Sequence, residues 1–110
     1  MIKVDKPQEF STEQCAAFEA QNKSRGKVQE VKFDSDETPD KPARFFIAKP
    51  SRQQLTAVSD TAERDKDAAN DLLINTAVLA GDLGQLNDDD GMYFGLLTEI
   101  GKLVQAKKKI

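Results

Sequence analysis

Two acidic clusters contain residues whose types and spacing could do chemistry. One spans Asp34–Asp40 and the other Asn87–Gly91. Carboxylate oxygens gathered in this way are ligands that a hard cation such as Ca²⁺ prefers. The first run lacks the sixth-position glycine and twelfth-position glutamate of an EF-hand loop, and the second would have to open at Leu86 and close at Leu97. We therefore interpret the first as a solvated loop and the second as a helix cap, and expect no metal site.

The candidate nucleophiles lack the partners that catalysis needs. The chain has no histidine, so its one cysteine, Cys15, would need a carboxylate or a lysine to form a thiolate. Ser11 and Ser51 each precede a glutamine by three residues, the spacing of a capping box, and are interpreted as helix caps. Gly81–Gly84 lacks the Gly-Lys-Ser/Thr that ends a phosphate-binding loop. We expect a protein that is not an enzyme, with no catalytic residue and no cofactor.

Composition narrows the class of protein further. A chain of 110 residues suits one domain, and its net charge of −3 disfavours a nucleic-acid binder. The lysines at 107–109 are interpreted as a solvated tail that offsets a helix dipole. The longest apolar run, Leu72–Ala80, is far shorter than the ~20 residues of a membrane span. With no secretion signal ahead of its single cysteine, the chain is expected to be soluble and cytoplasmic, with no membrane partner.

The first elements expected are a helix and a strand pair. Residues 1–26 form an N-terminal helical segment whose helix, Thr12 to about Asn22, has few apolar positions. Lys27–Phe33 alternates as a half-buried strand does, and Pro42–Ala48 supplies aromatic and β-branched residues for a second strand. A two-stranded hairpin is marginal alone, so we expect Phe45 and Ile47, or alternatively Phe46, to be covered by helices or by another chain.

Helices follow the hairpin. One begins after Ser51, and a short turn near Asp65 separates it from a second that covers Ala68–Ala80. Gly81 is expected to end this second helix as a left-handed C-cap.

The last helix completes the predicted fold. Asn87 or Asp88 is expected to cap it, and its apolar periodicity extends to about Ala106. The fold class is thus α+β: a short N-terminal helix, a two-stranded antiparallel hairpin and a bundle of about three helices. Residues 27–106 form the single α+β domain, and 107–110 form a basic tail.

Four motifs in order carry a resemblance to a known family. They are Val-Gln-Glu-Val-Lys-Phe (28–33), Ala-Arg-Phe-Phe-Ile-Ala-Lys-Pro-Ser-Arg-Gln-Gln-Leu (43–55), Leu-Leu-Ile-Asn-Thr-Ala-Val-Leu-Ala-Gly-Asp (72–82) and Asp-Asp-Asp-Gly-Met-Tyr-Phe-Gly-Leu (88–96). Over residues 27–106 this order resembles small phage and prophage proteins of the tail-assembly-chaperone type. The matched positions are Lys49, Pro50, Ser51, Arg52, Leu72, Leu73, Gly81, Asp82, Asp89, Asp90 and Phe94.

The resemblance implies a factor in the cytoplasm of the bacterial host that binds the tape-measure protein until the tail tube polymerises around it. A tape-measure chain exposes apolar helical stripes, and a small helical module can cover them through a groove between its own helices. The same apolar side chains are also candidates for the core. The partner-binding candidates are Phe46, Leu55, Met92, Tyr93, Phe94 and Leu96.

Two other functions stay open on the sequence. The chain is also a candidate structural tail or virion subunit, in which the hairpin supplies strand pairing between copies, so a homo-oligomer is possible. Small size and acidic charge also suit an anti-defence or regulatory binding protein.

Overall fold

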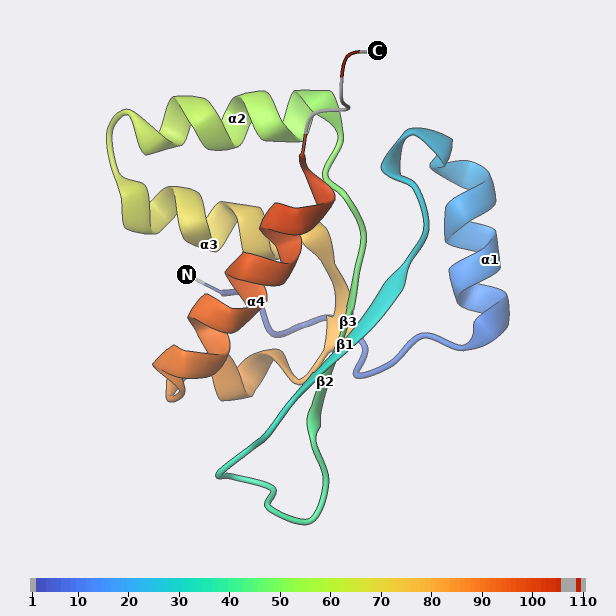
Figure 1. Ribbon diagram of the computed structural model, residues 1–110, viewed down its shortest axis with the longest axis vertical. Coiled ribbons are helices and arrows are strands. Elements are labelled where there is room, and N and C mark those ends of the chain that lie inside the picture. The colour runs from blue at the N-terminus through green and yellow to red at the C-terminus, as the bar shows by residue number, and fades with distance from the viewer. Residues whose placement is uncertain (1, 106–108, 110) are drawn as a thin grey trace.

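The computed structural model describes residues 2–105 and 109, so most of the predicted basic tail lies outside the described residues. A three-stranded antiparallel sheet has α1 on one side and the other helices on the opposite side (Figure 1). In chain order the elements are α1 (Thr12–Gln21), the 3₁₀ turn η1 (Lys23–Arg25), β1 (Gln29–Phe33), β2 (Ala43–Ile47), α2 (Arg52–Ala62), α3 (Lys66–Ala77), β3 (Val78–Gly81), η2 (Leu83–Asn87) and α4 (Asp90–Leu103). The α+β class is confirmed.

β2 is the central strand of the sheet. It pairs with β1 in the predicted antiparallel hairpin, where Val31 lies opposite Phe45. Phe45 and Ile47 are fully buried, and Phe46, on the opposite face, is also buried. The strand therefore needs cover on both faces, which the helices and the N-terminal segment supply.

The third strand corrects the prediction. A helix was expected to continue to Ala80, but α3 ends at Ala77 and Val78 turns into an extended conformation. The last three residues of the apolar run and Gly81 form β3, in which Ala80 lies opposite Phe46. Gly81 is consequently the last residue of a strand with φ +150°, and the predicted left-handed helix cap at this position is wrong.

The predicted helix starts at Ser11, before the hairpin, and at Ser51, after it, are confirmed. Ser11 and Ser51 both form complete capping boxes, each accepting a hydrogen bond from the main-chain N–H of the glutamine three residues later. The expected turn near Asp65 is present, and this residue caps α3 by accepting a hydrogen bond from Ala68 N at 3.1 Å. Short polar signals thus fix where these helices begin.

The start of α4 is displaced from the prediction. Its N-cap is Asp89, whose side chain accepts a main-chain hydrogen bond of 2.9 Å, whereas Asn87 and Asp88 belong to η2 and its end. The helix ends at Leu103; the expected end at Ala106 lies outside the described residues.

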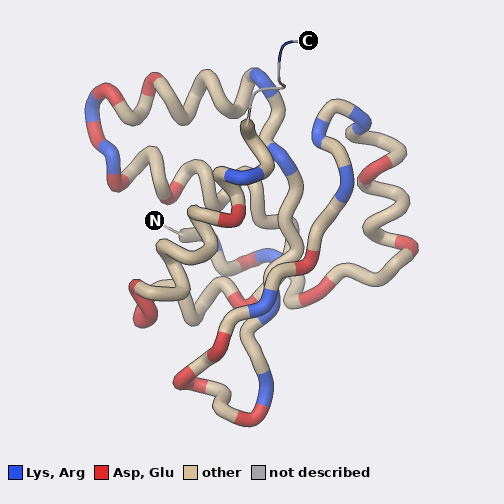
Figure 2. Tube along the Cα trace, in the orientation of Figure 1, with Lys and Arg blue, Asp and Glu red and all other residues tan. Residues whose placement is uncertain are grey.

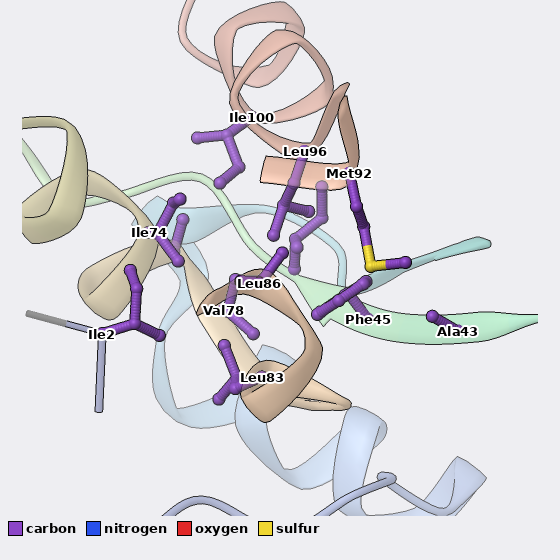
Figure 3. Close-up of a cluster of buried hydrophobic side chains, with 12 residues drawn as sticks. Ile2, Ala43, Phe45, Ile74, Val78, Leu83, Leu86, Met92, Leu96 and Ile100 are labelled. Atoms are coloured by element: carbon purple, nitrogen blue, oxygen red, sulfur yellow. The ribbon is translucent and has the colours of Figure 1, made fainter. Parts of the chain in front are cut away.

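One core cluster joins the sheet to the helices on its α4 side. Figure 3 shows Met92, Leu96 and Ile100 projecting from α4 toward this cluster. Ile2 reaches the same cluster from the N-terminal segment, a contact that the polar sequence around it did not predict. No α1 side chain is fully buried, in keeping with its few apolar positions.

Substituting Gly81 tests the close approach of β3 to β2. A Cβ at this position would lie 2.6 Å from Arg44 O and 2.9 Å from Phe45 Cα, and the φ of +150° already disfavours a side chain. We expect Gly81→Ala to lower the free energy of unfolding in urea by about 2 kcal/mol or more.

Gly101→Ala is the matched control, because nothing lies within 4 Å of a Cβ there and alanine favours the helix. It should leave stability unchanged or slightly raised. Equal stability of the two variants would contradict the close packing of β3.

Candidate functional site

An exposed aromatic side chain marks the candidate site. Phe94 on α4 is 59% exposed, which is unusual for a large apolar residue of this chain. It borders a hollow of about 400 Å³ between α3, η2 and α4. The side chains that line it are aliphatic or aromatic, acidic, or in one case an amide: Ile2, Leu86, Tyr93 and Phe94, then Asp67, Asp71 and Asp90, and Asn87. We call this set the aromatic surface.

Tyr93 holds the aromatic surface to α3. Its ring meets Phe94 edge-on, with centroids 5.3 Å apart and an angle of 85° between the planes. Its hydroxyl donates a hydrogen bond of 2.7 Å to Asp71 Oδ1. Burial, followed by this hydrogen bond and the negative charge of Asp71, raises the pKa of the Tyr93 phenol. Tyr93 therefore stays a neutral donor that fixes α4 against α3.

The position of Phe94 follows from the way α4 begins. Asp89 caps the helix, and Leu86 in η2 anchors the preceding turn in the core. With Met92 and Leu96 facing inward, helical spacing turns the residue midway between them outward. Phe94 is exposed because the core already occupies the opposite side of α4.

The charged side chains that line the aromatic surface are acidic. Asp67, Asp71 and Asp90 line the hollow, and none of its described lining residues is Lys or Arg. Figure 2 shows acidic residues at the start of α4 and along the loop between β1 and β2, while Lys and Arg gather near η1 and the start of α2. An apolar patch with an acidic rim suits a basic amphipathic segment.

The predicted partner-binding residues do not form one groove. Tyr93 and Phe94 share the aromatic surface, but Met92 and Leu96 are buried in the core. Leu55 instead lines a separate cleft of about 550 Å³ beside α2, together with Lys49, Pro50, Arg52 and Val104.

Phe46 lies on the other face of the sheet and is only 6% exposed. Its ring centroid is 6.4 Å from that of Phe10, and the Arg44 guanidinium carbon lies 5.7 Å from the Phe46 ring. The choice of Phe46 as a partner-binding candidate overlooked this cover.

The sequence did not predict the acidic residues around the aromatic surface, nor Ile2 as one of the residues that line its hollow. Asp71 and Tyr93 are 22 residues apart, and only the packing of α3 on α4 brings them together. Asp90 was interpreted as part of the cluster at the helix cap, and it also lines the hollow. Ile2 gave no signal, because the segment of residues 1–8 is short and mostly polar.

The residues considered for catalysis and metal binding have ordinary surroundings. Burial, followed by the charges of Glu19 and Glu30, raises the pKa of the Cys15 thiol, which disfavours the reactive thiolate. Among residues 2–105 and 109, no three His, Cys, Asp or Glu side chains gather closely enough to hold a metal ion. In the acidic loop between β1 and β2, Ser35 Oγ accepts a hydrogen bond of 3.1 Å from Thr38 N.

Comparison with protein-family models, with curated proteins and with solved structures found no match for this chain. Within the part of the chain that the structure describes, every helix is too short or too polar to cross a membrane.

A double-mutant cycle tests the bond that holds the aromatic surface. Tyr93→Phe removes the hydroxyl that donates to Asp71, and a charge-assisted hydrogen bond in a half-buried site stabilises by about 1 to 2 kcal/mol. We expect a coupling energy of about 1 kcal/mol between Tyr93→Phe and Asp71→Asn in urea unfolding. Because the cycle subtracts any other contact of Asp71, a coupling near zero would contradict the hydrogen bond.

Proposed function

We propose that this protein is a non-enzymatic tail-assembly chaperone of a phage or prophage, and that it binds the tape-measure protein through the aromatic surface. The observation that carries the proposal is Phe94, a large exposed side chain fixed beside an acidic hollow. Exposed aromatic residues in such settings are frequent anchors of protein interfaces.

The chemistry of the surface favours a helical partner. Phe94 and Tyr93 offer two ring faces, and the hollow beside them can receive an apolar side chain from an amphipathic helix. Asp67 and Asp90 are placed to attract lysine or arginine on the flanks of that helix. We therefore propose a partner segment with one apolar stripe and basic flanks, bound less tightly at high salt.

The biological setting comes from the sequence resemblance over residues 27–106. A tape-measure protein is long and largely helical, and its apolar stripes require cover before the tail tube forms. The chaperone would act in the cytoplasm of the bacterial host and leave before the particle is complete. Mass spectrometry of purified virions should accordingly detect the tape-measure protein without this chain.

A structural tail or virion subunit is the second candidate. The observation that favours it is β1, an edge strand that only β2 pairs with among the described residues. An open edge is suited to pairing between subunits. Finding this chain in mature virions at the copy number of a tail component would favour this function over the chaperone.

Removing the Phe94 ring tests the binding surface. Because the side chain is mostly exposed, Phe94→Ala should change the free energy of unfolding by no more than about 0.5 kcal/mol. Phe94→Ala should weaken binding to the tape-measure protein of the same genome by about tenfold or more, measured by calorimetry. On co-expression with this variant, the tape-measure protein should be less soluble than with the unmodified protein.

Val4→Ala is the matched control, since Val4 is 58% exposed and does not line the hollow. It should bind as the unmodified protein does. Equal binding by both variants would overturn the proposed surface, and no binding by the unmodified protein would overturn the proposed partner.

A further inference from the structure

The two edge strands of the sheet, β1 and β3, differ in what covers their outer sides. The N-terminal segment covers the outer edge of β3: Pro7 O accepts a hydrogen bond of 2.9 Å from Gly81 N, and the Lys6 ammonium donates to the carbonyl of Val78. β1 is the opposite edge, and no other strand of the described chain pairs with its outer side. In Figure 1 it lies in front of β2, with no helix drawn across it. One edge is therefore covered, and the other is unpaired along β1, although Glu19 of α1 accepts a hydrogen bond of 2.8 Å from Val28 N just before this strand.

The sequence of β1 is self-complementary when it pairs with a second copy in antiparallel orientation. Centred on Val31, this register places Glu30 opposite the other copy's Lys32, and Lys32 opposite the other copy's Glu30. Both charged side chains are on one face, because the register with β2 places them opposite Phe46 and Arg44. Directly opposed side chains lie about 5 Å apart, within reach of an ion pair.

The apolar face of β1 matches in the same register. Val31 meets the same residue of the other copy, and Gln29 meets Phe33. Val31 and Phe33 are half-buried against the core, so a second strand would extend the covered face. A shift by one residue would place the charges on the apolar face, which opposes other registers.

We propose that two copies of this chain form a two-fold symmetric dimer by pairing their β1 strands, which joins the two sheets into one of six strands. Charge complementarity selects a second copy over an unrelated strand, because the same residues supply both partners. Within one copy Lys32 Nζ lies 3.9 Å from Glu30 Oε1, but the Lys32 side chain is 57% exposed and that of Glu30 36%, so both can also reach across the edge.

This dimer goes beyond the proposed chaperone function and does not depend on it. A two-fold axis at Val31 that keeps the sheet continuous leaves both α4 helices on the same face. The two aromatic surfaces would then face the same side, an arrangement that suits a long partner with repeated binding segments.

Charge reversal tests the pairing by analytical ultracentrifugation at low salt. The unmodified chain should be a dimer. Glu30→Lys places lysines opposite each other, and Lys32→Glu does the same with glutamates, so each variant alone should raise the dimer dissociation constant by about tenfold or more. An equimolar mixture of the two variants restores both opposite-charge pairs and should form a heterodimer.

Three results would overturn the proposal: a monomer at every concentration of the unmodified chain, a dimer that neither variant weakens, or a mixture that fails to associate.

Glu30 also pairs with Arg44 of the same copy at 3.3 Å, so Glu30→Lys can disturb folding as well as pairing. Circular dichroism detects such a folding defect. In that case cross-linking decides. In a Cys15→Ser background, Val31→Cys should form a disulfide-linked dimer under mild oxidation, whereas Gln29→Cys should not, because it faces Phe33 of the other copy. Equal cross-linking of both variants, or of neither, would contradict the register.

Discussion

The burial of β2 on both faces is the constraint on which the rest of the structure depends. Phe45 and Ile47 need the core formed by α3, η2 and α4, while Phe46 needs Phe10 and the guanidinium group of Arg44. A lone hairpin could not satisfy both faces, and its second strand would have an open side. β3 supplies the missing pairing, and only a glycine at position 81 lets its main chain pass so close to Phe45. The third strand therefore turns a marginal hairpin into a sheet that can carry helices.

The same constraint decides which aromatic side chains are available to a partner. The aromatic and aliphatic residues nearest to β2 pack in the core. Met92 and Leu96, on the inner side of α4, are buried in the same core. Phe94, on the outer side of the same helix, has no place in it. Tyr93 is partly buried: its ring packs against the core, and its hydroxyl donates a hydrogen bond to Asp71. The candidate site is thus the side of α4 that does not pack in the core, with acidic residues of α3 and α4 around it.

Local signals made part of this structure predictable. The capping boxes at Ser11 and Ser51 and the alternation before Phe33 are short-range patterns, and the corresponding elements are present. β3 was missed because a continuous apolar run fits a buried helix and a buried strand equally well, and the choice depends on pairing with a strand over thirty residues earlier. The aromatic surface was predicted only in Tyr93 and Phe94. Its acidic rim depends on how α3 packs on α4, which no local pattern encodes.

Site-specific photocrosslinking tests the central claim, that the outer side of α4 is the partner-binding surface, most directly. Benzoylphenylalanine in place of Phe94 should cross-link to the co-expressed tape-measure protein, while the same photoreactive residue in place of the equally exposed Val4 should not. Cross-linking from the position of Leu55, with none from position 94, would contradict the account and move the binding surface to the cleft beside α2.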